Sequence, residues 1–404
     1  MSALLPLLPG QTLGVMGGGQ LGRMFVQSAQ RMGYRTVVLD PDADSPAGRV
    51  SETHLQFSYL APEGLRQLAA LCSAITTEFE NVPSQALAEL AQHRPVAPGA
   101  EAVAIAQDRA REKAHFLKCG VPVAPHQVIS NAEQMASVPA SLFPGILKTT
   151  RLGYDGKGQI RVSHASDLPA AWQALQGNAT TPVTCVLEKM LPLAAECSVI
   201  VARGADGQQV HLPIQRNLHR EGILALTEVF PGGIDAIFSQ QAIAAAQAVA
   251  AGLDYVGVLC VEFFLLAPGP DRDALGPLVV NEMAPRPHNS GHYSQDACDV
   301  SQFELQVRCM AGLPLTAPRQ HSPALMLNLL GDLWFRNAEG APTEPPWERV
   351  LALPGTHLHL YGKSSARRGR KMGHLNVTGA SPEAVRATAL QAAGLLGIAP
   401  FQTP

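Results

Sequence analysis

A dense set of polar side chains directly follows an apolar run late in the chain, and it restricts how the chain can fold. The run 278–280 (LVV) leads into residues 281–292, which read NEMAPRPHNSGH. Pro, Asn and Gly are typical of the turn that ends a strand, but a turn requires neither Glu282 nor Arg286. The segment therefore predicts a buried strand whose end opens into a functional site.

A second apolar run, residues 256–266, contains a single charge, Glu262, at its centre. A lone carboxylate in a buried strand needs a partner. Because strand residues alternate between two faces, Glu282 is expected to share a face with Val280, and neighbouring strands can bring Glu262 and Glu282 together. Two converging carboxylates suit Mg²⁺, which takes one or two protein carboxylates plus substrate phosphates. Ion pairs with Arg286 or Lys148 are the alternative interpretation.

The composition is that of an ordinary globular protein of two or three domains, with 404 residues, 46% of them hydrophobic and 16% charged. A formal net charge of −3 provides no basic field for nucleic acid. Seven cysteines without a CxxC pair argue against a disulfide framework or a zinc site of the usual spacing, and for a reducing, cytoplasmic location. The N-terminal sequence lacks a signal peptide's basic region, and we expect no membrane segment.

The order of apolar runs and helical patterns predicts three parts. In residues 1–107, strand-like runs 12–16, 36–39 and 74–79 alternate with helical patterns 21–32 and 63–72, which predicts a parallel βαβ arrangement. Residues 108–315 begin with a charged helix and continue with several strands. A Pro-rich stretch near residue 316 opens a C-terminal part, 316–404.

The first of the predicted strands leads into Gly17-Gly18-Gly19-Gln20-Leu21-Gly22, which fits GxGxxG. Asp40 ends the next strand, where a ribose-binding acid would lie in a dinucleotide-binding protein. The same loop suits any phosphate at a helix N-terminus, and tight packing of strand against helix would also require glycines. The loop alone leaves these interpretations open.

A lysine and a glycine-rich loop predict a second phosphate site. Lys148 closes the apolar run 145–147, and residues 153–159 read GYDGKGQ. Backbone amides of such a loop can surround a triphosphate, with Lys148 as a point charge. The spacing differs from GxxxxGK[ST] and favours a β-hairpin flap over nucleotide phosphates.

Together these segments resemble the ATP-grasp superfamily, and within it the 5-(carboxyamino)imidazole ribonucleotide synthases. The matching segments are GGGQLGRM at 17–24, TEFENVP at 77–83, Asp108-Arg109 with Lys113, GYDGKGQ at 153–159, Asn217-Leu218-His219, residues 281–292, SQFE at 301–304 and GRKMGHLN at 369–376. They span nearly the whole chain in one order. The resemblance implies an α/β chain with an N-terminal Rossmann-like parallel-sheet domain, a central two-part ATP-grasp domain and a small C-terminal domain.

The resemblance also implies a reaction. ATP and bicarbonate would carboxylate the exocyclic amine of 5-aminoimidazole ribonucleotide through carboxyphosphate, in purine biosynthesis, releasing ADP and phosphate. It implies Mg²⁺ as a cofactor, a homodimer, and a mutase that receives the product. No nucleic-acid or membrane partner is expected.

Site residues follow position by position from the matching motifs. The implied ATP contacts are Arg109, Lys148, Gly153, Tyr154, Asp155, Gly156, Lys157, Gly158, Glu188, Lys189, Met190, Leu191, Glu196, His219, Asn281 and Glu282. The implied substrate contacts are Gln20, Leu21, Glu78, Tyr154, Lys157, Arg286, Asn289, Lys363, Arg370 and Lys371. Arg286 and Lys148 would be catalytic, and Glu262 and Glu282 would hold Mg²⁺.

Some positions depart from the pattern or keep two interpretations. Many ATP-grasp proteins place a metal-binding asparagine at the position of Ala284, so the metal would rely on Glu282, with Asn281 pointing elsewhere. Strand alternation predicts that only one of Glu78 and Glu80 enters the site. His219 lies either near the nucleotide or as a satisfied buried histidine. His288 and His292 are expected to cap the strand end, His292 in a structural role.

Two other functions compete with this interpretation. A sister ATP-grasp enzyme, such as a formate-dependent glycinamide ribonucleotide transformylase or a biotin carboxylase, would share the glycine flap and the paired glutamates. The pair Asn289-Ser290 and the absence of long extensions argue against it. An NAD-dependent oxidoreductase built on residues 17–40 would leave Lys148 and the paired glutamates without a purpose.

Overall fold

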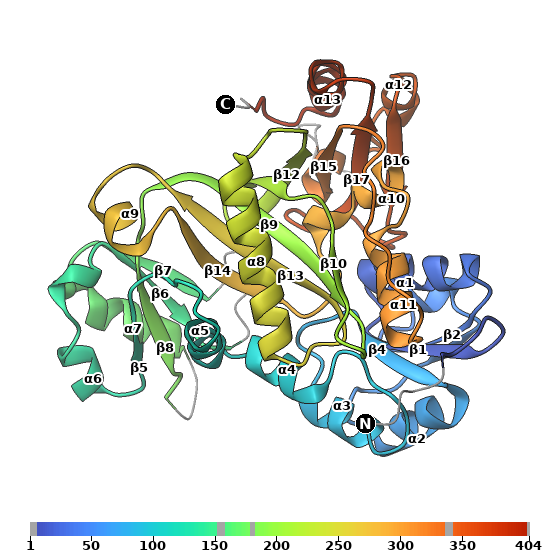
Figure 1. The fold of residues 1–404 in the computed structure, drawn as a ribbon, viewed down its shortest axis with the longest axis horizontal. Coiled ribbons are helices and arrows are strands. Elements are labelled where there is room, and N and C mark those ends of the chain that lie inside the picture. The colour runs from blue at the N-terminus through green and yellow to red at the C-terminus, as the bar shows by residue number, and fades with distance from the viewer. Residues whose placement is uncertain (1–5, 152–157, 178–181, 336–341, 402–404) are drawn as a thin grey trace.

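The computed structural model describes residues 6–151, 158–177, 182–335 and 342–401. Within them the chain forms three sheets with helices packed on their faces (Figure 1). Apolar clusters hold the helices against each sheet, so the core is divided into several parts.

The N-terminal sheet is parallel, with strand order β3-β2-β1-β4. Its strands are β1 (Thr12–Met16), β2 (Arg35–Leu39), β3 (Thr53–Leu55) and β4 (Ala74–Thr77). The helices of this part are α1 (Gln20–Arg31), α2 (Pro62–Leu71), α3 (Ser84–Leu90) and α4 (Ala100–Ala106). Apolar clusters lie on both faces of this sheet, as expected for a parallel sheet joined by helical crossovers. The predicted βαβ arrangement is confirmed.

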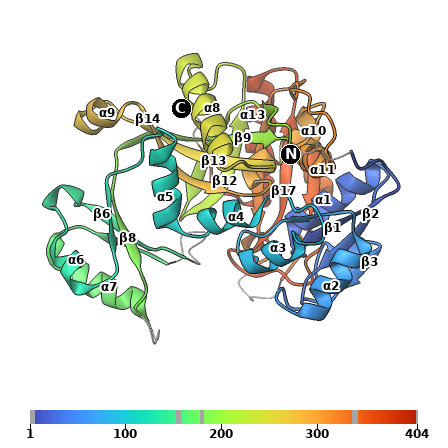
Figure 2. The ribbon, with the colours of Figure 1, turned by 60° about the horizontal axis from the view of Figure 1, so that its bottom comes forward.

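A small antiparallel sheet lies apart from the N-terminal one, with α4 and α5 (Arg109–Lys118) between them (Figure 2). Its strand order is β5-β8-β6-β7. The strands are β5 (His126–Ile129), β6 (Gly145–Thr149), β7 (Gln159–Val162) and β8 (Cys185–Lys189), and the helices are α6 (Ala132–Ala136) and α7 (Leu168–Gln176). A small apolar cluster that includes Leu147 and Leu187 joins the sheet to α7.

The largest sheet has nine strands in the order β14-β13-β9-β11-β12-β15-β17-β16, with β10 paired to β9. The strands are β9 (Leu193–Arg203), β10 (Gln209–His211), β11 (Gln215–Arg220), β12 (Ile223–Val229), β13 (Gly257–Leu266), β14 (Leu278–Ala284), β15 (Ala324–Leu330), β16 (Thr356–Leu360) and β17 (Lys371–Thr378). The helices are α8 (Ala236–Gly252), α9 (Pro270–Leu275), α10 (Ser294–Ala297), α11 (Gln302–Met310), α12 (Trp347–Leu351) and α13 (Pro382–Leu396).

The large sheet continues across the boundary that we predict near residue 316. β12 pairs with β15 through Leu226 opposite Leu327, so strands of the central and C-terminal parts hydrogen-bond to each other. Leu226 also belongs to the apolar cluster beneath α13. The two parts therefore share a sheet and a core, and the position of the boundary stays a prediction.

Candidate functional site

One cavity of about 830 Å³ lies where the three sheets meet. Its wall combines the glycine loop after β1, the turn after β4, the ends of β6 and β7, strands of the large sheet, and the segment before β17. Charged side chains from all three parts of the chain face it. Such a cavity can enclose a nucleotide together with a second, smaller substrate.

The paired glutamates lie opposite each other on this wall. Glu262 on β13 is in register with Glu282 on β14, as expected, but the next pair is Phe263 with Val280. A β-bulge leaves Asn281 as the extra residue. The bulge breaks the alternation that we predicted, since Glu282 lines the cavity while Val280 is buried in the core.

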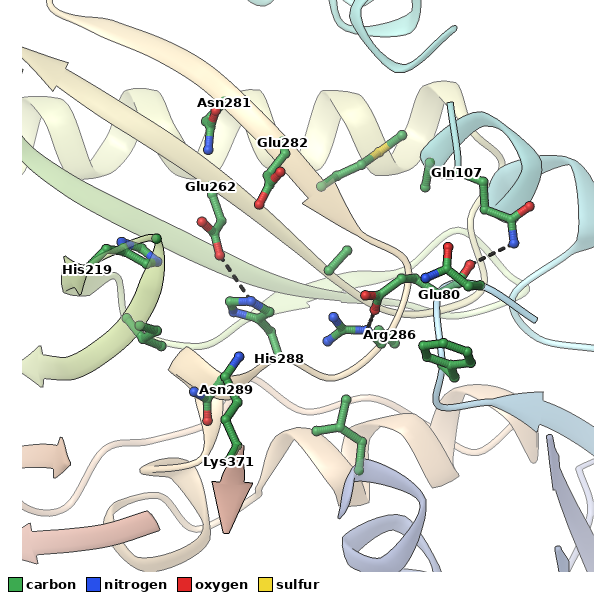
Figure 3. A pocket seen from close by; sticks show the side chains of 18 of the residues that line it. Glu80, Gln107, His219, Glu262, Asn281, Glu282, Arg286, His288, Asn289 and Lys371 are labelled. Atoms are coloured by element: carbon green, nitrogen blue, oxygen red, sulfur yellow. Dashed lines mark hydrogen bonds and ion pairs between the residues drawn. The ribbon is translucent and has the colours of Figure 1, made fainter. Parts of the chain in front are cut away.

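Asn281 lines the same cavity next to Glu282, and its orientation relative to the metal stays a prediction (Figure 3). Its Oδ1 atom is buried and has no hydrogen-bond partner in the described structure. A buried carbonyl oxygen without a donor is costly. The two carboxylates of Glu262 and Glu282 are donors suited to a hard cation.

The two glutamates pair with groups other than the alternatives Arg286 and Lys148. Arg109 Nη1 lies 3.0 Å from Glu282 Oε2, and His288 Nε2 lies 3.0 Å from Glu262 Oε1. Burial raises the pKa of Glu262 to about 7, with Glu282 contributing and His219 opposing. Burial also acts to raise the pKa of Glu282, but Arg109 and Lys148 outweigh it and hold that pKa below its ordinary value.

Lys148 reaches the cavity from β6, and a buried carboxylate holds it there. Glu188 on β8 accepts from Lys148 at 3.1 Å, and Lys113 on α5 lies 3.2 Å from its other oxygen. Burial acts to raise the pKa of Glu188, yet Lys148, Lys113 and Arg109 outweigh it and lower the pKa to about 2. Lys113 is only 1% exposed. The motifs include it, but its part in this triad is not predicted by the sequence.

Only part of residues 188–191, which we predict to contact the adenine base, lines the cavity. Met190 and Leu191 line the cavity, whereas Glu188 is engaged by the two lysines behind the wall. Lys189 forms an ion pair with Asp271 of α9. The side chains of Glu188 and Lys189 are therefore not placed as nucleotide contacts here, because each has a charged partner that the linear sequence does not indicate.

Glu196 and His219 lie next to each other on β9 and β11 and line the cavity. His219 Nδ1 hydrogen-bonds to Glu196. Burial alone would lower the pKa of His219, but this hydrogen bond and the charges of Glu262 and Glu196 raise it to about 9. Both interpretations of His219 thus hold in part, since the ring is paired and also faces the cavity.

Glycines of the first loop pack around two carboxylates. Gly18 N–H and the Tyr59 hydroxyl donate to Asp40 Oδ2 at 2.7 and 2.6 Å. A Cβ atom at Gly19 would lie 2.8 Å from Glu78 Oε1, and one at Gly18 would lie 2.8 Å from the Asp40 Cβ. Asp40 therefore holds the loop, where a dinucleotide-binding protein would offer this acid to a ribose.

The N-terminus of α1 divides its amides between Glu78 and the cavity. Gly19 N–H and Gly22 N–H donate to the two oxygens of Glu78 at 2.9 and 3.0 Å. Gln20 and Leu21 lie between them and line the cavity. Their amides are at the end of the helix that favours anions.

Glu78 and Glu80 both line the cavity, so the prediction that only one enters is wrong. Alternation does not apply, because β4 ends at Thr77 and the chain turns there. Arg286 Nε donates to Glu80, and Gln107 Nε2 donates to the Glu80 carbonyl at 2.7 Å (Figure 3). No motif in the sequence predicted Gln107 as a residue of the site.

The C-terminal basic residues reach the opposite wall of the cavity. Lys363, Arg370 and Lys371 all line it, and so does Asn289. Lys363 Nζ donates to the Lys371 carbonyl at 2.6 Å, and Arg370 Nη1 donates to the Ser365 carbonyl at 2.9 Å. Both polar atoms of the Asn289 side chain are buried and lack a hydrogen-bond partner among the described residues. Asn289 is therefore placed to bind a ligand.

His288 and His292 take different places. His288 Nδ1 lies 2.9 Å from Ser290 Oγ, and its other nitrogen faces Glu262. His292 is 1% exposed and receives a hydrogen bond from Gln302 Nε2 at 3.0 Å. Burial lowers the pKa of both rings well below the ordinary value, with nearby cationic and histidine groups adding to it. The structural role expected of His292 agrees with this geometry.

The predicted glycine flap falls mostly outside the described residues. The flap residues outside the described ranges are Gly153, Tyr154, Asp155, Gly156 and Lys157. Gly158, the first described residue after them, has φ +70°. Gln159 and Arg161 on β7 line the cavity together with Lys148 on the neighbouring strand β6.

Three family models match the chain in succession. They are the ribonucleotide synthetase preATP-grasp domain over residues 10–107, the ATP-grasp domain over 114–303 and the phosphoribosylaminoimidazole carboxylase C-terminal domain over 324–388. An N5-carboxyaminoimidazole ribonucleotide synthase from Brucella melitensis is 41% identical, covering 91% of this chain and 96% of the relative. The enzyme of that name from Bacillus subtilis is 37% identical, covering 91% and 92%.

The chain belongs to the N5-carboxyaminoimidazole ribonucleotide synthase family. A solved synthetase of this family in complex with ADP superimposes with a TM-score of 0.87 at 38% identity, covering 98% of both chains. The Aspergillus clavatus synthase in complex with ADP and 5-aminoimidazole ribonucleotide gives 0.82 at 31% identity, covering 96% of this chain and 98% of that one.

Family membership confirms the resemblance and the predicted fold class. The parallel N-terminal sheet, the ATP-grasp domain and the C-terminal domain are those of an N5-carboxyaminoimidazole ribonucleotide synthase. A helix able to cross a membrane is absent from the part of the chain that the structure describes.

Proposed function

We propose that this protein is an ATP-dependent ligase that carboxylates the exocyclic amine of 5-aminoimidazole ribonucleotide with bicarbonate, releasing ADP and phosphate. The observation that carries the proposal is one cavity with a carboxylate floor and cationic walls on both sides. Arg109 and Lys148 lie toward one side, and Lys363, Arg370 and Lys371 lie on the other. Two phosphate-bearing substrates would fit such a division, and membership of the synthase family supports the assignment.

The floor of the cavity fits Mg²⁺. Glu262 and Glu282 face each other in register, and both line the cavity. These would be the protein oxygens that hold the ion, with phosphate oxygens completing its shell. When bound, Mg²⁺ neutralises charge on the transferring phosphoryl group.

The triphosphate would bind between Arg109 and Lys148. In the ligand-free cavity these cations pair with Glu282 and Glu188. Arg109 would turn from Glu282 toward phosphate oxygens, leaving both oxygens of that carboxylate for the metal. Glu196 would accept hydrogen bonds from the ribose hydroxyls, and His219 would donate one to the ribose. Met190 and Leu191 would contact the base. Catalysis by such a site consists mainly of positioning and charge neutralisation.

Bicarbonate would bind at Arg286. In the structure the guanidinium of Arg286 pairs with the Glu80 carboxylate. Bicarbonate is also a planar anion, and a guanidinium can bind two oxygens of such an anion. An oxygen of bicarbonate attacks the γ-phosphorus, the bond to ADP breaks, and carboxyphosphate forms. The amine then attacks the carboxyl carbon, phosphate leaves, and the amine loses a proton. Lys148 would stabilise charge on the transferring group.

The ribonucleotide would bind across the opposite wall. The Gln20 and Leu21 amides, together with Arg370 and the lysines beside it, would hold its 5′-phosphate. Asn289, whose side-chain amide has no partner among the described groups, would hydrogen-bond the ribose or base. Glu78 would act mainly by holding the α1 amides in place, since both its oxygens already accept backbone N–H groups.

ADP release from Mg²⁺-ATP and bicarbonate, measured with and without 5-aminoimidazole ribonucleotide, tests the proposal. Turnover that requires this nucleotide is the expected result. Stimulation by glycinamide ribonucleotide with formate would instead assign a transformylase, and NAD binding without ATP turnover would contradict the proposal. A homodimer, a cytoplasmic location and delivery of the product to a mutase belong to the same proposal, and sedimentation of the purified protein tests the first.

A further inference from the structure

Cys260, Glu262 and His288 form a compact group of metal-binding side chains at the floor of the cavity. One donor atom from each, a sulfur, an oxygen and a nitrogen, lies within 4.8 Å of the other two. Cys260 and Glu262 share a face of β13, two residues apart, and His288 approaches from the segment after β14. Figure 3 shows the imidazole of His288 directed at the Glu262 carboxylate.

The surroundings orient this group as a metal site requires. Ser290 Oγ lies 2.9 Å from His288 Nδ1 and 4.0 Å from Cys260 Sγ. In the structure Nδ1 accepts the backbone N–H of Ser290 at 3.3 Å, which leaves the ring proton on Nε2 facing Glu262. An ion at Nε2 therefore requires the other tautomer, in which the proton moves to Nδ1 and is donated to Ser290 Oγ. A metal-binding histidine is usually oriented by such a hydrogen bond from its second nitrogen. The residue opposite Cys260 on β14 is Ala284, and Cys260 itself is fully buried.

The donor types distinguish this group from the Mg²⁺ ligands. Mg²⁺ takes oxygen ligands, whereas a thiolate and an imidazole with one carboxylate suit Zn²⁺, at about 2.0–2.3 Å from each donor. Glu262 would belong to both sets. An ion entering from the cavity would reach Glu262 and His288, which line it, before Cys260 behind them.

We propose that Cys260, Glu262 and His288 form a binding site for Zn²⁺ or a similar thiophilic divalent ion, which inhibits ATP turnover by withdrawing Glu262 from Mg²⁺. Coordination replaces the thiol proton, which passes to solvent, and a water completes the tetrahedral shell. The binding site stands on the geometry alone, whereas the inhibition rests on the proposed function.

Cobalt(II) titration of the full chain tests the site without reference to activity. Co²⁺ replaces Zn²⁺ in such sites, and a bound thiolate gives a charge-transfer absorption in the near ultraviolet. We expect this absorption in the wild-type protein and its loss in Cys260→Ser, with Cys260→Ala as a second variant if the first folds poorly. The control is Cys119→Ser, because Cys119 is partly exposed and its sulfur lies 3.4 Å from His115 Nε2.

Absence of the absorption from the wild-type protein, or its persistence in Cys260→Ser, would overturn the site. In ADP-release assays, Cys260→Ser should keep the Mg²⁺-supported rate and require at least about 10-fold more Zn²⁺ for half inhibition, the usual effect of weakening a metal site. A Cys260-dependent absorption without inhibition by Zn²⁺ would support the site and contradict the role of Glu262 in turnover. Failure of the proposed function is thereby distinguished from failure of the site.

Discussion

At the scale of single residues, two arginines of the cavity pair with glutamates that also line it. Arg109 pairs with Glu282, and Arg286 pairs with Glu80. Anionic substrates would therefore replace protein carboxylates at cations that are already ordered. An exchange of this kind spares the cost of ordering a long side chain on binding. Mutations of one partner are expected to affect ligand binding more than folding.

Glu282→Gln should reduce ATP turnover by about 100-fold or more, the order seen when one preorganised electrostatic group is removed. The fold should be retained, because Glu282 lines the cavity, outside the apolar clusters, and the amide keeps the shape of the carboxylate. ADP release and thermal unfolding measure the two effects. Glu304→Gln, which breaks an ion pair with Arg308 on α11, is the matched control. Turnover like that of the wild type would remove Glu282 from the mechanism.

Arg370→Ala should raise the KM for the ribonucleotide by about 10- to 100-fold, as expected from losing a charge-assisted hydrogen bond of ~1.5–3 kcal/mol. The KM for ATP should change little, because Arg370 lies on the wall opposite Lys148. Steady-state kinetics with each substrate varied provide the comparison. Arg368→Ala is the control, since its side chain is 68% exposed and pairs only loosely with Asp332, at 3.8 Å. Equal changes in both KM values would contradict the assignment.

The pair of His219 and Glu196 predicts a pH dependence of stability. The hydrogen bond and nearby carboxylates raise the folded-state pKa of His219 to about 9, above its ordinary value of 6.5. The charged form is thus favoured by folding, so the stabilisation is complete below pH 6.5 and is lost as the pH rises through about 9. At about 1.4 kcal/mol per pKa unit, it amounts to at most about 3 kcal/mol.

Denaturant unfolding of the wild type and His219→Gln, in buffer with a chelator, measures this contribution. The difference in unfolding free energy should be largest near pH 6 and should approach a constant, smaller value above pH 9. His321→Gln is the control, because His321 is exposed and its ring lies 3.1 Å from the hydroxyl of its neighbour Ser322. A difference that grows with pH would show that the sign is wrong.

At the scale of elements, α5 joins two walls of the cavity. Arg109 reaches Glu282 on β14, and Glu112 accepts the N–H of Met283 at 2.7 Å. One turn further, Lys113 reaches Glu188 on β8. Residues at i, i+3 and i+4 share one face of a helix, so a single helical face holds the large sheet and the small sheet in register around the nucleotide region.

The buried triad of Lys113, Lys148 and Glu188 predicts which of its variants loses more unfolding free energy. Glu188→Gln leaves Lys113 and Lys148 without an anion and should cost about 3–5 kcal/mol of unfolding free energy. Lys113→Met leaves Lys148 and Glu188 as a neutral pair and should cost less. It should nevertheless raise the KM for ATP, because Glu188 would then hold Lys148 more tightly.

Denaturant unfolding and ATP kinetics of both variants test this order, with Lys113→Arg expected to restore part of the ATP affinity. Lys118→Met, at the end of the same helix, is the control. A larger loss of stability in Lys113→Met than in Glu188→Gln would contradict the charge argument.

At the scale of the whole molecule, the nine-stranded sheet ties the central part to the C-terminal part. In a chain of residues 1–315 the large sheet would end at β12. The edge of β12 would then expose the backbone groups that pair with β15, and it would also expose the apolar Leu226. Such an open apolar edge promotes aggregation. We therefore expect a chain truncated after residue 315 to be insoluble or aggregated, as measured by size-exclusion chromatography beside the full chain. A monodisperse, folded fragment would contradict this.

Local patterns in the sequence predicted the elements well where one period dominates. The run 12–16 matches β1, the pattern 21–32 matches α1 within one residue at each end, and the run 256–266 matches β13 to within one residue. The facing pair of Glu262 and Glu282 follows from two apolar strands, each with one carboxylate. The order of the motifs was enough to predict the fold class, because each motif consists of residues within one short segment of the sequence.

The tertiary structure decided which charges meet. The bulge at Asn281 depends on the pairing of β13 with β14. The burial of Glu188 against Lys148 joins residues 40 positions apart, and the contact of Arg286 with Glu80 joins residues 206 positions apart. Spacing along the chain contains no information about such partners. The sequence by itself therefore determined the elements, the fold and the residue types at the site, since these reflect local propensity and burial. Only the folded chain determined the pairings, since electrostatic energy depends on distances in space.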